Sequence, residues 1–314
     1  MVLTTPVVRC LKKQFPGAVV HYITKKQFRP VIEANPYIDK IITINEKVEE
    51  VLADLKAENY DHIIDLHKNF RSRKICLGLK AKCTSFNKIN IRKWLIVNLK
   101  INRLPGVHIV DRYFEAVAHL GVNNDGLGLD YFIPPSEDSS LEDLPASHRE
   151  HYVGWVIGGK HNTKIYPEEK IIEICRRISG PIVLIGGPED QEKGGRIAGA
   201  AGEHVLNACG KFSLNRSASL VKNAKLVMTN DTGMMHVAAA FRKQIISFWG
   251  NTIPEFGMYP YMPGDEMRST MLGVNNLSCR PCSKIGFDSC PKGHFRCMND
   301  IDGDEVIRLI RENL

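Results

Sequence analysis

The sequence predicts an α/β protein made of two Rossmann-like units. From residue 2 onward, short apolar runs alternate with helical stretches, as expected for parallel strands joined by helices. A stretch rich in Pro, Ser, Asp and Glu, from Asp130 to Glu150, interrupts this alternation, which then restarts. We therefore expect an interdomain linker there. A chain of 314 residues, 43% of them apolar, is long enough for two such domains.

The first half opens with a helix whose two ends are marked in the sequence. Thr4 or Thr5 can cap its start, Pro6 suits its first turn, and Gly17 ends it. The following segments are predicted, in order, as a strand at Ala18 to Thr24, a helix over "KQFRPVIEANP", a strand at Lys40 to Ile44, a helix from about Glu46 to Glu58, a strand in "DHIIDLH" and a helix over "YFEAVAHLGV".

The second half repeats the alternation with more apolar strands. The predicted order is "HYVGWVIGG" (strand), "PEEKIIEICRRIS" (helix), "PIVLIGG" (strand), "PEDQEKGGRIAGAAG" (helix), then "VLNACG", "LNRSASLVKNA", "KLVMTND" and "GMMHVAAAF". Ligand-binding groups in such units gather at strand C-termini and helix N-termini. We therefore expect a binding site facing a cleft.

Composition narrows the function classes. No apolar run approaches the twenty or so residues of a membrane-spanning helix, and the N-terminus lacks the pattern of a signal peptide. These features favour a cytoplasmic protein, whose nine cysteines are expected to stay reduced or bind metal rather than form disulfides. The net charge of +7 favours an anionic partner. Basic residues run through the chain without forming a long tail, so nucleic acid is not the expected partner.

The strongest motif is "KLVMTNDTGMMHVAAAF", from Lys225 to Phe241. An apolar strand leads into a polar turn and then a small-residue helix, which exposes backbone N–H groups where a phosphate can bind. Asp231, Thr232 and Gly233 lie at this position, and His236 follows one turn into the helix. A purely structural interpretation stays open, in which Asp231 or Thr232 is only an N-cap and His236 a buried helix histidine.

The segment "TNDTGMMHVAAA" resembles the signature of glycosyltransferase family 9, the ADP-heptose:lipopolysaccharide heptosyltransferases. Three other stretches match in the same order: "LTTPVVRCLKKQFPGAVVHYIT", "YDHIIDLHKNFRSR", and "KIYPEEKIIEIC" followed by "VLIGGPEDQE". The resemblance covers nearly the whole chain. It implies a GT-B fold, with an N-terminal acceptor domain at 1–140, a C-terminal donor domain at 150–314 whose final helix can pack back on the first domain, and no cofactor or metal for sugar transfer.

The resemblance also implies roles for individual donor-side residues. Asp231, Thr232, Gly233 and His236 would hold the diphosphate and sugar of the donor, and Met234 would line its adenine or ribose side. Lys164, before the helix start in "KIYPEE", would contact the same donor; a mobile cation beside a helix N-terminus suits a diphosphate. In "GGPEDQE", Gly187 would approach the nucleotide and Glu189 the ribose hydroxyls, although Glu189 can equally be a first-turn charge.

The acceptor side is predicted in "DLHKNFRSR". Asn69, Arg71 and Arg73 lie at and beyond a strand end, where they can bind an anionic glycolipid core, with Arg71 the first choice; a solvated basic face is the alternative. Family members carry an apolar strand and a Gly-Asp turn before the segment that starts here at Met1. The first N-terminal strand and the usual catalytic base are therefore expected to be missing, and no substitute base among His21, Asp65 and His67 is favoured.

Four cysteines lie close together near the C-terminus: Cys279, Cys282, Cys290 and Cys297, with His294 between the last two. They could form a structural zinc site, but their spacing is irregular for one, so no metal is expected.

The leading hypothesis is inverting transfer of a heptose or similar sugar from a nucleotide-diphosphate donor to a lipopolysaccharide inner-core acceptor, at the cytoplasmic face of the inner membrane and compatible with peripheral membrane contact. Two rivals remain: a nucleotide-sugar-binding protein without turnover, and a zinc-containing nucleic-acid-binding protein.

Overall fold

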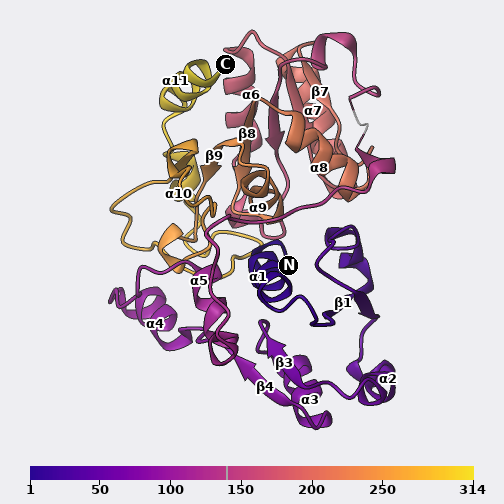
Figure 1. Cartoon of the computed structure of the whole chain (residues 1–314). Helices are drawn as coiled ribbons and strands as arrows, with labels where there is room; N and C mark the ends of the chain where they lie inside the picture. The colour runs from indigo at the N-terminus through magenta and orange to yellow at the C-terminus, as the bar shows by residue number, and fades with distance from the viewer. Residues whose placement is uncertain (139–140) are drawn as a thin grey trace. The chain divides into compact units, whose positions relative to one another are not determined.

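A computed structural model describes residues 1–138 and 141–314 (Figure 1). The chain divides into two compact units, one made of residues 1–90 and 107–132 and the other of residues 91–106 and 133–314. Each unit is described by itself. The predicted linker, 130–150, includes Ser139 and Ser140, which lie outside the described residues.

The first unit contains two separate parallel sheets of two strands each. Its regular elements are α1 (Thr5–Gln14), β1 (His21–Lys25), β2 (Lys40–Ile44), α2 (Leu52–Ala57), β3 (His62–Asp65), α3 (Phe70–Gly78), β4 (Lys82–Ser85) and α5 (Ile109–Tyr113). β1 pairs with β2, and β3 pairs with β4. The expectation of a missing first strand stays a prediction.

The three predicted strands and the first helix are present, but the other predicted helices are short or replaced by 3₁₀ turns. The helix predicted over "YFEAVAHLGV" is two 3₁₀ turns, Phe114–Ala116 and Ala118–Leu120, that follow α5. The strand at Lys40–Ile44 has the predicted bounds. The helix predicted over "KQFRPVIEANP" is instead a 3₁₀ turn, Lys26–Val31, with Pro30 inside it, because proline cannot donate the backbone bond that an α-helix needs. The helix expected from Glu46 to Glu58 is a 3₁₀ turn followed by the short α2.

An ion-pair cluster around the buried Arg9 holds α1 in the first unit. Arg9 is 2% exposed, and its guanidinium donates to both carboxylate oxygens of Asp125, at 2.9 and 2.7 Å, and to the Gly128 carbonyl at 2.9 Å. It also contacts Asp130. The Arg9 hydrogen bond holds the pKa of Asp125 at about 2, whereas burial raises the pKa of Asp130.

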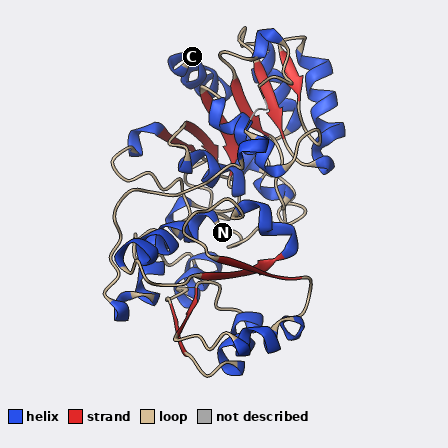
Figure 2. Ribbon diagram, turned by 45° about the vertical axis from the view of Figure 1, so that its right-hand side comes forward, coloured by secondary structure: helices blue, strands red, loops and turns tan. Residues whose placement is uncertain are grey.

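The second unit is a doubly wound sheet of six parallel strands, shown in red among blue helices in Figure 2. The strand order is β10-β9-β8-β5-β6-β7. The elements are β5 (Val153–Val156), α6 (Glu168–Arg176), β6 (Ile182–Ile185), α7 (Gln191–Ala201), β7 (Val205–Asn207), α8 (Leu214–Asn223), β8 (Leu226–Asn230), α9 (Gly233–Ala240), β9 (Gln244–Phe248), β10 (Ser269–Leu272), α10 (Arg296–Asn299) and α11 (Gly303–Asn313). Residues 91–106 add α4 (Asn90–Trp94), which begins in the first unit, and a π-helical turn at Leu95–Leu99.

The core of this unit lies between the sheet and its helices. β5, β6 and β8 are buried at every position, as expected for strands covered on both faces. Ile171 and Ile174 of α6 and Val306 of α11 share one core with Trp155 and Leu184 of the sheet. The strand order reverses between β5 and β8, which places the topological switch point of the sheet there.

Candidate functional site

The β8–α9 junction provides an anion-binding geometry at this switch point. β8 ends at Asn230, and α9 starts at Gly233 with Thr232 as its N-cap. The Thr232 side chain makes no capping hydrogen bond, and a Cβ built on Gly233 would meet nothing within 4 Å. Because Gly233 is also exposed, the start of α9 is accessible to a ligand, and the helix dipole there favours negative charge.

Lys164 and Asp231 form an ion pair beside this helix start. The Lys164 ammonium donates to Asp231 Oδ2 at 2.5 Å, and the two side chains are 17% and 11% exposed. Thr252, after β9, donates its hydroxyl to the same oxygen at 2.9 Å. Lys164 lies in the loop after β5, Asp231 follows β8, and Thr252 follows β9. The loops after three neighbouring strands therefore meet at the Asp231 carboxylate.

Asn230, the last residue of β8, forms hydrogen bonds to the loop after β5. Its side chain is buried and donates to the Gly158 carbonyl at 3.0 Å, while its Oδ1 accepts from the Tyr166 backbone N–H at 3.0 Å. This amide fixes the loop after β5, which carries Lys164. The sequence analysis missed Asn230 and Thr252, since both look like ordinary strand-end polar residues until the sheet order is known.

The turn after β6 borders a cavity of about 400 Å³. The Gly187 N–H donates to Asp190 Oδ2 at 3.1 Å, and burial raises the pKa of Asp190. A Cβ on Gly158 would overlap the Asp190 carboxylate, so this close approach requires glycine. The cavity lining consists of Gly159, Asn162, Ile165, Tyr166, Pro167, Glu168, Glu189, Asp190, Lys193 and Phe295. Its volume suits a nucleoside-sized ligand.

The remaining donor-side candidates also lie in the second unit. Glu189 is exposed in the cavity lining, and Met234 is half-buried in the first turn of α9. His236 is 8% exposed and lies one turn into the helix. Lys193 was also not predicted from the sequence. Its ammonium donates to the Ile157 carbonyl at 2.8 Å, and burial lowers its pKa.

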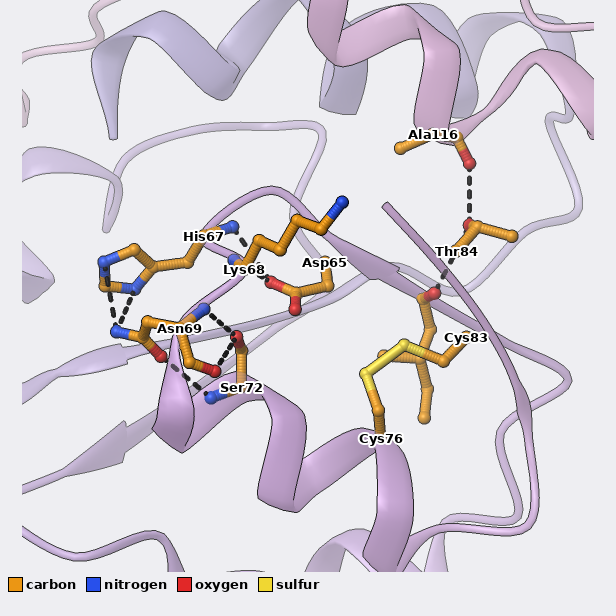
Figure 3. Close-up of a disulfide and its surroundings, with 10 residues drawn as sticks. Asp65, His67, Lys68, Asn69, Ser72, Cys76, Cys83, Thr84 and Ala116 are labelled. Atoms are coloured by element: carbon orange, nitrogen blue, oxygen red, sulfur yellow. Dashed lines mark hydrogen bonds between the residues drawn. A yellow bond between two sulfur atoms is a disulfide. The ribbon is translucent and has the colours of Figure 1, made fainter. Parts of the chain in front are cut away.

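The acceptor-side candidates lie in the first unit, at the turn between β3 and α3 (Figure 3). Asp65 Oδ1 accepts from the backbone N–H groups of His67 and Lys68, at 2.9 and 2.6 Å. Asn69 caps α3: its Oδ1 accepts from the Ser72 N–H at 3.0 Å, and its own N–H donates to the Ser72 hydroxyl at 2.9 Å. Both side chains therefore stabilise the turn itself.

Arg71 and Arg73 follow in the first turn of α3, where both are exposed. Neither forms a salt bridge among those found in the described residues. The Asn69 amide lies 3.2 Å from His67 Nδ1. Partial desolvation of the His67 ring, with the cations Lys88 and Arg71, lowers its pKa.

A disulfide joins α3 to β4, shown in yellow in Figure 3. Cys76 and Cys83 are bonded, with Cα atoms 5.6 Å apart, within the range that a disulfide spans. The expectation that the cysteines remain thiols or bind metal is therefore wrong for this pair. The disulfide could not be predicted, because the short α3–β4 connection that brings the two residues together was not predicted either.

The C-terminal cysteine cluster has a different arrangement. Cys279, Cys282, Cys290 and Cys297 are free thiols, and Cys279 Sγ lies 3.9 Å from His294 Nε2. Burial raises the pKa of Cys297 to about 11. Across residues 1–138 and 141–314, no three His, Cys, Asp or Glu side chains are grouped so as to hold a metal ion.

Comparison with known proteins assigns the family. Residues 48–287 match the sequence profile of glycosyltransferase family 9 (heptosyltransferase). The chain belongs to this family. It is therefore a glycosyltransferase, and the resemblance noted from the "TNDTGMMHVAAA" segment is confirmed.

A curated relative supports this assignment, and solved structures share the fold. Lipooligosaccharide heptosyltransferase 2 of Haemophilus influenzae is 33% identical over 281 residues, which cover 82% of this chain and 81% of that protein. Among solved structures, the family 9 glycosyl transferase of Veillonella parvula has a TM-score of 0.78 at 24% identity, over 99% of this chain and 92% of that one. The Escherichia coli heptosyltransferase WaaC with ADP has a TM-score of 0.71 at 20% identity, over 100% and 96% of the two chains.

These structural likenesses confirm the predicted GT-B fold. In the part of the chain that the structure describes, no helix has both the length and the apolar character that crossing a membrane requires.

Proposed function

We propose that this glycosyltransferase transfers a heptose from ADP-heptose to the inner core of a lipopolysaccharide or lipooligosaccharide, with inversion at the sugar carbon. The names of its relatives support the sugar and the acceptor, and the ADP of the WaaC structure supports the nucleotide. The observation that carries the proposal is the open N-terminus of α9 beside the Lys164–Asp231 pair. Residues 150–314 act as the donor domain and residues 1–140 as the acceptor domain.

On the donor side, the diphosphate binds at the start of α9. The N–H groups of Gly233 and Met234 and the Thr232 hydroxyl donate to its oxygens, with Lys164 supplying positive charge and His236 a further donor. The charge that develops on the departing ADP is stabilised by these fixed groups, which need no reorganisation during the reaction. The cavity after β6 takes the nucleoside, with Glu189 on the ribose hydroxyls. Gly187, in the turn after β6, lies near the nucleotide.

On the acceptor side, Arg71 and Arg73 bind the anionic groups of the glycolipid core, and Asn69 positions the turn that presents them. The acceptor hydroxyl must lose a proton to a general base as the sugar transfers. Asp65 uses one carboxylate oxygen for two backbone N–H groups, and His21 Nδ1 lies 2.8 Å from the Tyr60 hydroxyl. His67, whose lowered pKa keeps its imidazole neutral near pH 7, is the first of the three to test.

The reaction takes place at the inner face of the cytoplasmic membrane, where a lipid-anchored acceptor presents its core to the enzyme. The direct experiment incubates the protein with ADP-heptose and an acceptor that lacks heptose, and measures the acceptor mass. We expect a gain of one heptose residue, and a loss of at least tenfold in rate for Lys164→Ala.

Lys160→Ala is the matched control, because Lys160 is an exposed lysine of the same loop. Donor binding without any transfer would instead support the alternative of a nucleotide-sugar-binding protein without turnover. Equal losses for the two lysine variants would contradict the assignment of Lys164.

A further inference from the structure

The positive charge of the chain is concentrated in one stretch. Residues 66–110 contain 11 Lys and Arg and no Asp or Glu. The chain as a whole holds 42 Lys and Arg against 35 Asp and Glu, so the remainder holds 31 basic and 35 acidic residues. The net charge of +7 therefore arises entirely from this stretch, rather than from the spread of basic residues that the composition suggested.

Within that stretch, residues 91–103 expose large apolar side chains. Ile91 is 76% exposed, Trp94 55%, Leu99 53% and Ile101 45%. They belong to α4, labelled in Figure 1, and to the π-helical turn and extended residues that follow it. We call these thirteen residues the basic-apolar segment.

The inner side of the basic-apolar segment packs on the second unit. Ile96 is buried with Ile253 and Phe256, and Val97 and Leu104 pack against the same cluster. The Lys93 ammonium lies 5.7 Å from the centre of the Phe256 ring.

Lys100 fixes the end of the segment. Its ammonium donates to the carbonyls of Cys279 and Pro281, at 3.1 and 2.7 Å. The segment is therefore held to the unit by one face, and its exposed apolar side chains lie on a supported element rather than on a free loop.

The exposed side of the segment combines two features. Arg92 and Arg103 are exposed in the same stretch as the four apolar side chains, and the segment contains no Asp or Glu. Apolar and tryptophan side chains flanked by arginine and lysine are the composition with which interfacial segments bind an anionic bilayer: the apolar groups enter the headgroup boundary, and the cations contact lipid phosphates.

We propose that the basic-apolar segment docks the protein on the surface of an anionic lipid bilayer. The inference deepens the proposed function, because a glycolipid acceptor is itself held in such a surface. Docking by residues 91–103 keeps the enzyme on the membrane between acceptor encounters.

The test is binding to vesicles, measured by co-sedimentation without donor or acceptor. We expect the protein to bind vesicles of phosphatidylcholine mixed with phosphatidylglycerol, and to bind pure phosphatidylcholine at least tenfold more weakly. Trp94→Ser combined with Ile91→Ser should lower the partition coefficient at least tenfold. Met267→Ser is the matched control, because Met267 is 93% exposed in the same unit but lies next to Glu266.

Two results in the vesicle assay would overturn the inference: no binding of the wild type to anionic vesicles, or equal binding by the wild type and the double variant. A third is a dimer, seen by sedimentation, that only the double variant disrupts, because this would identify a protein interface. Circular dichroism and cooperative unfolding show that the double variant is folded. Because no sugar is transferred in this assay, failure of the proposed heptosyl transfer leaves its result unaffected, and heptosyl transfer to a soluble acceptor saccharide can succeed when docking fails.

Discussion

Replacing Asp231 by asparagine tests whether the Lys164–Asp231 pair organises the donor site. An exposed salt bridge contributes about 0–1 kcal/mol to stability, whereas breaking a fully buried one costs about 3–5 kcal/mol. With side chains 17% and 11% exposed, this pair lies between those limits. We therefore expect Asp231→Asn to lower the free energy of unfolding by about 1–3 kcal/mol, since it leaves the Lys164 ammonium without its carboxylate.

A double-mutant cycle with Lys164→Met, measured by urea unfolding, isolates the pair itself. We expect a coupling energy of about 1–2 kcal/mol between the two positions. A coupling below about 0.5 kcal/mol, which is within the usual additivity error, would refute the reasoning.

The same variant separates binding from turnover. Removing a carboxylate beside the proposed diphosphate should leave the affinity for ADP unchanged or higher, because a repulsive charge is gone. Heptosyl transfer should fall by about tenfold or more, equivalent to about 1.4 kcal/mol, because Lys164 and the turn lose their fixed positions. Unchanged turnover in the folded variant would contradict the role given to Asp231.

Three further predictions concern the two units. Lys164→Ala should lose more affinity for ADP than for adenosine in calorimetry, and equal losses would mean that Lys164 does not act on the diphosphate. Arg71→Ala should raise the KM for the acceptor several-fold with the Kd for ADP unchanged, and an unchanged KM would favour a merely solvated basic face. Arg9→Met should cost about 1–3 kcal/mol of stability, because two partly exposed carboxylates lose their buried cation. Arg9 holds the pKa of Asp125 at about 2, below its ordinary 3.8, so the stability from this bond is present above pH 4 and is lost as the pH falls toward 2. Acid unfolding curves of the wild type and Arg9→Met should therefore converge at low pH, and parallel curves would contradict the assignment.

The second unit was predictable from the sequence because its strands are short apolar runs with clear helical stretches between them. "KLVMTND" and "GMMHVAAAF" became β8 and α9, with the polar turn between them where the pattern placed it. The first unit was harder to predict. Its strands are only half-buried, and Pro30 ends a pattern that otherwise has helical spacing, so hydrophobic periodicity carries less information there.

The residues of the candidate site likewise differ in how far the sequence predicts them. Asp231, Thr232 and Gly233 could be predicted because a strand, a polar turn and a small-residue helix follow one another within one segment. Thr252 could not, because it reaches Asp231 only through the order of strands in the sheet, which no local pattern encodes. The disulfide between Cys76 and Cys83 was missed for a similar reason, since it depends on how α3 returns to β4.

The most direct test of the central claim is a crystal structure of the protein with ADP. The account predicts that the diphosphate lies at the N-terminus of α9, within hydrogen-bond distance of the backbone N–H groups of Gly233 and Met234 and of the Lys164 ammonium, with the nucleoside in the cavity lined by Glu189. An ADP bound with its diphosphate away from α9, or with Lys164 still paired only to Asp231, would contradict it.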